Sequence, residues 1–219
     1  MVDFARARKA MVDNQLRTSN VTDRRLLAVM GEVPRERFVP AARQTFAYTD
    51  VPHLLLPGRS ARALAAPAPF AKLVQLAGIR HTDRVLDLGC GTGYSTAVLA
   101  ALAARVVAID DQADLVAPAR ENLAALSVAN ATVIETPLAG GAPADAPFDV
   151  IVVEGLVDAA PAALFGQLAD GGRLVVLIRG GATAVANLFV KSGNDVAGRA
   201  EFNANLPPLN APAGDEFVF

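Results

Sequence analysis

Three glycines that directly follow a short apolar stretch constrain this chain more than any other feature. Residues 84–88 read Arg-Val-Leu-Asp-Leu, and the glycines stand at positions 89, 91 and 93, before an alanine-rich segment that starts at Ser95. The apolar stretch indicates a buried strand and the segment after the glycines indicates a helix. Glycines at such a junction let the backbone turn tightly and approach a ligand, while the helix start presents free N–H groups. The pattern therefore predicts a nucleotide-type binding loop.

Spacing and charge then select among nucleotide ligands. The dinucleotide fingerprint has its third glycine three positions after the second, whereas Tyr94 occupies that position here. Asp87 ends the strand, and its carboxylate would repel a pyrophosphate but suits a ligand that carries an amino group and a sulfonium. Asp110 ends the next strand, about 20 residues further on, where it is placed to accept hydrogen bonds from ribose hydroxyls. These features favour S-adenosylmethionine.

The residues expected at this cofactor belong to two adjacent strand ends: Asp87, Gly89, Cys90, Gly91, Gly93, Asp110 and Asp111. The competing interpretation is a plain strand-to-helix turn with solvated acids, but the glycines, both acids and the flanking elements all coincide. We expect Cys90 to pack against the cofactor rather than to act as a nucleophile. His53 and His81 have no partners at metal-ligand spacing, so we predict no metal site.

Strands and helices alternate along the second part of the chain. Strand-like stretches at 84–88, 105–110, 131–135, 148–153 and 173–178 are separated by helical segments that start at Ser95 and cover 115–126 and 161–168. Strands that are apolar without alternation are buried on both faces, as in a parallel sheet covered by helices. Extended stretches at 184–191 and 196–206 flank a turn-like Ser-Gly-Asn-Asp sequence. The expected fold is α/β, a doubly wound, mainly parallel, Rossmann-like sheet of seven strands with an antiparallel C-terminal hairpin.

The first part of the chain has a different organisation. Short helical pieces broken by prolines run to about residue 73, and residues 51–69 have the composition of a loop. We therefore predict a helical N-terminal cap with a functional loop over residues 1–73, followed by a cofactor-binding domain over residues 74–219.

Composition limits the partners of the protein. The formal net charge is −2, so no electrostatic footprint for nucleic acid or for an anionic membrane is visible. Cys90 is the single cysteine, which excludes an intramolecular disulfide, and no apolar run approaches the length of a membrane-spanning helix. The N-terminus lacks the apolar core of a signal peptide. We expect a cytoplasmic protein that binds neither nucleic acid nor membrane; the oligomeric state does not follow from these features.

Motifs along most of the chain resemble protein-L-isoaspartate O-methyltransferases, a family of class I methyltransferases. They stand at residues 11–17 (Met-Val-Asp-Asn-Gln-Leu-Arg), 23–27, 33–40 (Val-Pro-Arg-Glu-Arg-Phe-Val-Pro), 47–50, 87–94, 148–153 and 167–175. The resemblance implies a methyl acceptor in a protein or peptide, namely the abnormal α-carboxylate of an L-isoaspartyl residue, whose repair then proceeds through a succinimide. It also places Tyr94 beside the cofactor, with core packing as the alternative. Thr136 stands where the family has an aspartate that helps to read the adenine.

Several positions depart from the family pattern on the acceptor side. The family's Thr-Ile-Ser loop reads Ala-Leu-Ala at 63–65, so the acceptor-side serine is Ala65, and Glu154 stands where a threonine is usual. Ser60 is a candidate for the missing hydroxyl, with a simple turn residue as the alternative. Arg59 and Arg62 are candidates for clamping a carboxylate, with solvated surface as the alternative.

Three hypotheses remain open at this point. The chain methylates an isoaspartyl carboxylate, or the same fold methylates another acceptor, or it binds S-adenosylmethionine without turnover. A carboxylate is already ionised at neutral pH, so the first reaction needs no general base. The cofactor loop is compatible with all three.

Overall fold

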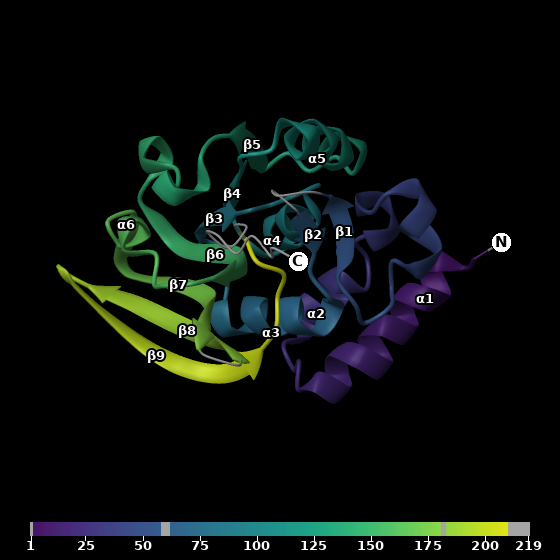
Figure 1. Cartoon of the computed structure of the whole chain (residues 1–219), viewed down its shortest axis with the longest axis horizontal. Coiled ribbons are helices and arrows are strands. Elements are labelled where there is room, and N and C mark those ends of the chain that lie inside the picture. Colours follow the sequence, from purple (N-terminus) through teal and green to yellow (C-terminus); the bar gives the residue numbers. More distant parts are fainter. Residues whose placement is uncertain (1, 58–61, 181–182, 210–219) are drawn as a thin grey trace, which may run out of the picture.

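The computed structural model describes residues 2–57, 62–180 and 183–209, and its ribbon is shown in Figure 1. A seven-stranded sheet forms its centre, with the strand order β5-β4-β3-β6-β7-β8-β9. The strands are β3 (Arg84–Leu88), β4 (Arg105–Asp110), β5 (Ala131–Glu135), β6 (Phe148–Val157), β7 (Leu168–Gly180), β8 (Thr183–Ser192) and β9 (Asp195–Ala204). Pairing is parallel from β5 to β7 and antiparallel from β7 to β9. The predicted doubly wound sheet with its C-terminal hairpin is confirmed.

Helices cover both faces of the sheet. They are α1 (Phe4–Met11), α2 (Arg24–Met30), α3 (Pro67–Ala77), α4 (Tyr94–Leu102), α5 (Ala113–Ala125) and α6 (Ala162–Phe165). Short 3-10 or π segments span Val12–Leu16, Arg17–Ser19, Arg35–Phe38, Ala41–Phe46, Leu138–Gly140 and Pro143–Asp145. Successive side chains of a strand point to opposite faces, and each face has its own apolar core. One core joins Val85 and Val106 to α2, α3 and α4, and the other joins Leu86 and Val107 to α6.

The segment expected as a loop at 51–69 contains more structure than its composition indicates. Strands β1 (His53–Leu56) and β2 (Arg62–Leu64) form a separate antiparallel pair, and α3 begins at Pro67. The loop prediction was wrong because it rested on four prolines, yet a proline in the first helical turn has no N–H to lose. In Figure 1 this pair lies beside α4, above the N-terminal helices.

Two further boundaries differ from the sequence prediction. The helix expected at 161–168 is only the four-residue α6, and β7 starts at Leu168 rather than at Arg173. Leu168 belongs to the sheet because it pairs with Phe148 at the start of β6. Neighbouring-strand pairing of this kind is not visible in local periodicity.

The division at residue 73 falls inside α3, which packs on β6, β7 and β8. One core cluster also contains both Met11 of the N-terminal part and Val150 of the sheet. The cap and the cofactor-binding part therefore share a core in the described residues, and their division remains a prediction. No helix within residues 2–57, 62–180 and 183–209 is long and apolar enough to span a bilayer.

A largely buried ion pair joins the loop before β3 to β7. The Asp83 side chain accepts hydrogen bonds from Arg173 Nη2 at 2.6 Å and from the Arg80 N–H at 2.7 Å. We expect Asp83→Ala to lower the free energy of unfolding by about 3 kcal/mol, because it leaves the Arg173 guanidinium without its counter-charge. Denaturant titration measures this. Asp158→Ala, which breaks the exposed pair with Arg179, should cost less than about 1 kcal/mol; equal losses would contradict the argument.

Candidate functional site

The loop between β3 and α4 has the geometry of a ligand-binding turn. Gly89 and Gly93 have φ values of 87° and 92°, in the left-handed region that favours glycine. A Cβ on Gly93 would lie 3.3 Å from the Ala119 side chain of α5. The N–H groups of Gly89 and Cys90 donate to the Ile109 carbonyl of β4 at 2.8 and 3.1 Å. The loop is therefore closed onto the neighbouring strand, and its glycines are required by the backbone and by packing.

Asp87 is fully buried near the end of β3, and its two carboxylate oxygens differ in their hydrogen bonds. Its Oδ2 accepts from Ser95 Oγ at 2.8 Å and from Thr96 Oγ1 at 2.6 Å, both at the start of α4. Its Oδ1 has no hydrogen-bond partner among the described residues. Burial raises the pKa of Asp87 to about 7, although the two hydroxyls lower it. A cationic amino group would both satisfy Oδ1 and restore the charge.

Asp110, at the end of β4, lies next to the same loop. Its Oδ2 accepts from the Gly91 N–H at 2.9 Å, and its Oδ1 accepts from the Gln112 N–H at 3.1 Å. The Thr136 N–H donates to the Asp110 carbonyl at 3.0 Å, whereas the neighbouring Asp111 is exposed. The fold thus brings the predicted cofactor residues of three strand ends together at one edge of the sheet.

Arg62 is buried, so the alternative interpretation of this residue as a solvated surface arginine is wrong. Its Nη2 lies 2.6 Å from Asp111 Oδ1, and its Nε lies 3.8 Å from Asp110 Oδ1. Its Nη1 also donates to the Leu209 carbonyl. The guanidinium therefore neutralises the two acids at the end of β4 and ties them to the C-terminal segment.

The C-terminal segment Leu206–Leu209 lies over the cofactor loop. The Leu156 N–H donates to the Pro207 carbonyl at 2.9 Å, and the Leu209 N–H donates to the Leu156 carbonyl at 3.0 Å. A side chain at Gly89 would meet a methyl group of Leu209, which would have to move aside. Leu209 thus occupies the space next to Gly89, where a ligand would otherwise approach the backbone.

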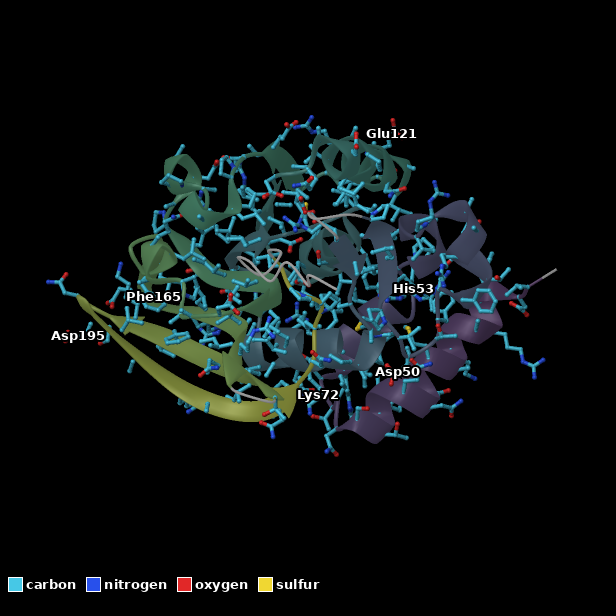
Figure 2. The ribbon with its side chains drawn as sticks, viewed as in Figure 1. Asp50, His53, Lys72, Glu121, Phe165 and Asp195 are labelled. Atoms are coloured by element: carbon cyan, nitrogen blue, oxygen red, sulfur yellow. The ribbon has the colours of Figure 1, made fainter. Side chains whose placement is uncertain are left out.

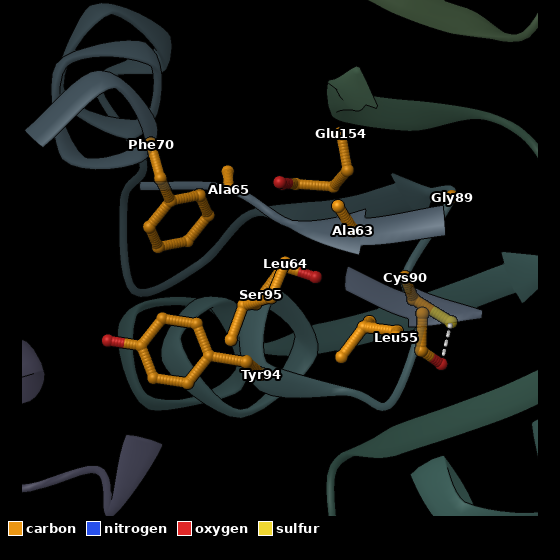
Figure 3. A pocket seen from close by; sticks show the side chains of 11 residues that line it. Leu55, Ala63, Leu64, Ala65, Phe70, Gly89, Cys90, Tyr94, Ser95 and Glu154 are labelled. Atoms are coloured by element: carbon orange, nitrogen blue, oxygen red, sulfur yellow. Dashed lines mark hydrogen bonds between the residues drawn. The ribbon is translucent and has the colours of Figure 1, made fainter. Parts of the chain in front are cut away.

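A pocket next to this loop contains most of the acceptor-side positions (Figure 3). The β1–β2 pair contributes Ala63 and Ala65, α4 contributes Tyr94, and β6 contributes Glu154. Ser60 and Arg59 lie outside the described residues. Ala65 therefore stands at the site, as the resemblance implies, but brings no hydroxyl to it.

Arg35 is a component of the site to which the sequence assigned no role. It is 0% exposed, its Nε donates to the Ala47 carbonyl at 2.7 Å, and its Nη2 donates to the Ala65 carbonyl. Its guanidinium also lies 4.8 Å from the centroid of the Tyr94 ring. Burial lowers the pKa of Arg35, while the neighbouring Tyr94 raises it. The position stands in the motif at 33–40, but only the tertiary contacts indicate that it anchors the backbone of the acceptor loop.

Tyr94 and Cys90 are both buried within the site. The Tyr94 ring packs against Phe38 and Phe70, with centroids 5.5 and 5.7 Å apart, and its hydroxyl has no partner among the described residues. Burial and the charge of Asp87 raise the pKa of the Cys90 thiol well above its usual range. A thiol held neutral is suited to packing rather than to attack. The described residues contain no cluster of three His, Cys, Asp or Glu side chains that could hold a metal ion.

The position of Leu209 generates a prediction about cofactor affinity. A ligand that approaches the Gly89 backbone must first displace the Leu209 side chain, and that displacement reduces the apparent affinity. We expect Leu209→Ala to tighten binding of S-adenosylmethionine by roughly tenfold, as measured by titration calorimetry. Val190→Ala, at an exposed apolar residue on β8, is the control. Weaker binding by Leu209→Ala would mean that the leucine contacts the ligand instead of blocking it.

Comparison with known proteins identifies the family. A family model described as protein-L-isoaspartate(D-aspartate) O-methyltransferase matches residues 6–206. A protein-L-isoaspartate O-methyltransferase of Koribacter versatilis is 42% identical over 176 residues, which cover 80% of this chain and 78% of the relative. One of Methylorubrum populi is 43% identical over 176 residues, which cover 80% of each chain.

Solved structures agree with this result. A structure of a protein-L-isoaspartate O-methyltransferase superposes with a TM-score of 0.81 at 25% identity, over 96% of this chain and 66% of that longer chain. This chain therefore spans slightly less than two thirds of that protein. A Plasmodium falciparum structure described by the same activity, in complex with S-adenosyl-L-homocysteine, shares the fold with a TM-score of 0.78 at 22% identity, over 93% of this chain and 98% of that one. The chain belongs to the protein-L-isoaspartate O-methyltransferase family.

Proposed function

We propose that this protein is an S-adenosylmethionine-dependent O-methyltransferase that transfers a methyl group to the α-carboxylate of L-isoaspartyl residues in damaged proteins. The observation that carries the proposal is the joint geometry at the ends of β3 and β4 in a chain of this family. One buried oxygen of Asp87 has no partner among residues 2–57, 62–180 and 183–209, and Asp110 lies beside the glycine loop. The donor and acceptor groups present thus fit the amino group and the ribose of the cofactor.

The chain's own residues supply positioning rather than acid–base chemistry. S-adenosylmethionine supplies an activated methyl group when bound. Its carboxylate acceptor is ionised at neutral pH, because carboxyl groups have a pKa of about 4 in water. The protein has to align the attacking oxygen and exclude water, and alignment of this kind accounts for much of the rate. Buried Ala65, Phe70 and Tyr94 around the pocket suit that task.

Charge in the site favours an anionic acceptor on one side and a cationic cofactor on the other. Arg35 is buried behind the acceptor loop and donates to the Ala65 carbonyl, so its positive charge lies on the acceptor side. Asp87 and Asp110 lie on the cofactor side, at the ends of their strands. In the interior such charges act with a lower effective dielectric constant than in water. We infer that this separation orients the two substrates.

The acceptor belongs to a protein or peptide, and the protein works in the cytoplasm without binding nucleic acid or membrane. We base this part of the proposal on the family and on the modest net charge of −2. We also propose that Asp111 and Thr136 contact the cofactor. The same proposal includes a helical cap over residues 1–73 and a cofactor-binding domain over residues 74–219.

A second candidate function rests on Ala65, because the acceptor pocket has no hydroxyl at that position. The same cofactor site would then serve a different methyl acceptor, or would bind S-adenosylmethionine without turnover. Acceptor identity separates these functions, and it is directly measurable.

The proposal is tested with a pair of peptides that differ only in one linkage. Purified protein is incubated with radiolabelled S-adenosylmethionine and either an isoaspartyl peptide or its normal aspartyl twin. We expect label on the isoaspartyl peptide alone, because the normal linkage presents its carboxylate in a different geometry. Cofactor binding by calorimetry without label on either peptide would sink the proposal and favour the second candidate function.

Restoring the family serine tests the acceptor side separately. A hydrogen bond to a charged group typically contributes about 1.5 to 3 kcal/mol. We therefore expect Ala65→Ser to raise kcat/KM for the isoaspartyl peptide by at least roughly tenfold. Ala63→Ser adds the same hydroxyl at another position of the pocket and is the matched control. If Ala65→Ser gains nothing over this control, the missing hydroxyl does not limit the enzyme.

A further inference from the structure

Glu154 is a carboxylic acid in the acceptor pocket that the reaction described above does not use. It lies on β6, one residue beyond the last residue that pairs with β3, at the irregularity between Val152 and Leu156 in the pairing with β7. Such irregularities bend a strand and redirect a side chain. Figure 3 shows its carboxyl group pointing into the pocket, toward the side where Ala65 lies.

Glu154 is a half-buried residue, and one of its two carboxyl oxygens is enclosed by the pocket. Its Oε1 is buried and has no hydrogen-bond partner among the described residues. The neighbours that β2 and α3 contribute to the pocket are Ala63, Leu64, Ala65 and Phe70, which carry no charge or side-chain donor. A buried polar atom of this kind is costly unless a ligand satisfies it.

Asp87 decides which of the two neighbouring acids holds a proton. Asp87 accepts two hydroxyl hydrogen bonds, from Ser95 and Thr96, which stabilise its ionised form. Burial and the negative charge of Asp87 raise the pKa of Glu154 well above its usual range. Two close carboxyls cannot both ionise easily, so the one without donors keeps the proton.

Five other ionisable groups lie in or around the site: Cys90, Asp110, Tyr94, Arg35 and Arg62. Cys90, in the glycine loop, is held as a neutral thiol, and Asp110 adds negative charge from β4. Tyr94 of α4 lines the pocket, and burial raises its pKa as well. The guanidinium of Arg35 is engaged by Ala47, Ala65 and the Tyr94 ring, and that of Arg62 by Asp111. Glu154 therefore presents an O–H donor to the pocket.

We propose that Glu154, in its protonated form, donates one hydrogen bond to the acceptor carboxylate, separate from the one that a hydroxyl at position 65 would add. This inference rests on the proposed isoaspartyl activity. An ionised glutamate would repel an anionic acceptor, whereas a carboxylic acid forms a strong, charge-assisted hydrogen bond with it. The arriving carboxylate adds a third negative charge to the site and holds the proton on Glu154 more firmly.

Glu154 binds and orients but does not exchange its proton in the reaction. It donates to the acceptor oxygen that does not attack. The other oxygen forms a bond to the methyl carbon while the methyl–sulfur bond breaks and its electron pair remains on the sulfur. A carboxylate and a sulfonium become a neutral ester and a neutral thioether, so no proton has to be taken up or released.

The experiment compares Glu154→Gln, Glu154→Ala and Glu121→Gln across a pH series. Glutamine keeps a donor of nearly the same shape, alanine removes it, and Glu121 is an exposed residue on α5 where the same Glu→Gln substitution is made outside the pocket (Figure 2). Rates are measured as kcat/KM with the isoaspartyl peptide, and cofactor binding is measured by calorimetry. Thermal unfolding checks that each variant folds.

We expect Glu154→Ala to lower kcat/KM by roughly ten- to a hundredfold, with cofactor affinity unchanged within about threefold. The wild-type rate should fall as the pH rises through the pKa of Glu154, because the donor is lost there. Glu154→Gln should retain its rate over that range, and Ala65→Ser should raise the activity of Glu154→Ala as it does that of the wild type. Glu121→Gln should keep the wild-type profile.

The outcomes separate this inference from the function on which it rests. Wild-type protein that labels the isoaspartyl peptide, together with Glu154→Ala and Glu154→Gln at the wild-type rate and pH profile, overturns the inference and leaves the function standing. Glu154→Gln as inactive as Glu154→Ala, or loss of cofactor binding in either variant, overturns the donor role. Wild-type protein that labels neither peptide overturns the proposed function and this inference with it.

Discussion

The corner between β3 and α4 is the constraint on which the rest of the site depends. Asp87 is buried there and accepts hydrogen bonds from two hydroxyl groups in the first turn of α4, at 2.8 and 2.6 Å. These bonds join the end of the strand to the start of the helix. The glycine loop between them closes onto β4 through the Ile109 carbonyl. Because the strands are parallel, their carboxyl ends meet at one edge, and the groups at the ends of β3, β4 and β6 become neighbours. The cofactor and acceptor sites that we propose therefore lie at the same edge of the sheet.

The charges of the buried side chains differ between the cofactor side and the acceptor side of the proposed site. Asp87 and Asp110 supply negative charge on the cofactor side, while Arg35 brings a buried positive charge to the backbone of the acceptor loop. Glu154 lies at the boundary, and burial, with the negative charge of Asp87, raises its pKa well above the usual range. A neutral acid can serve an anionic acceptor without losing the negative field that a sulfonium requires. The two residues that depart from the family pattern, Ala65 and Glu154, thus line the same pocket, and we interpret them as related changes on the acceptor side.

The alternation of apolar stretches and helical segments was sufficient to predict the sheet, because burial on both faces leaves a strong local signal. It failed at residues 53–56 and 62–64, which form the antiparallel pair of β1 and β2. It also failed at α6, which the pairing of Leu168 with Phe148 shortens. Both errors concern pairings between segments that are separate along the chain, and a local pattern carries no information about such partners.

By itself, the sequence determined the fold class, the glycine loop and the acids that follow β3 and β4, because backbone turns and strand ends depend on residue type and spacing. It also identified Ala65 and Glu154 as departures from the family. Only the tertiary structure decided what those residues face: Arg35 against the Ala65 carbonyl, Arg62 against Asp111, and Leu209 over Gly89. Together with the hydrogen bond from Arg62 to the Leu209 carbonyl, these contacts join segments up to 147 residues apart. Their charges and shapes act through space, so their effect on the site follows from packing and not from position along the chain.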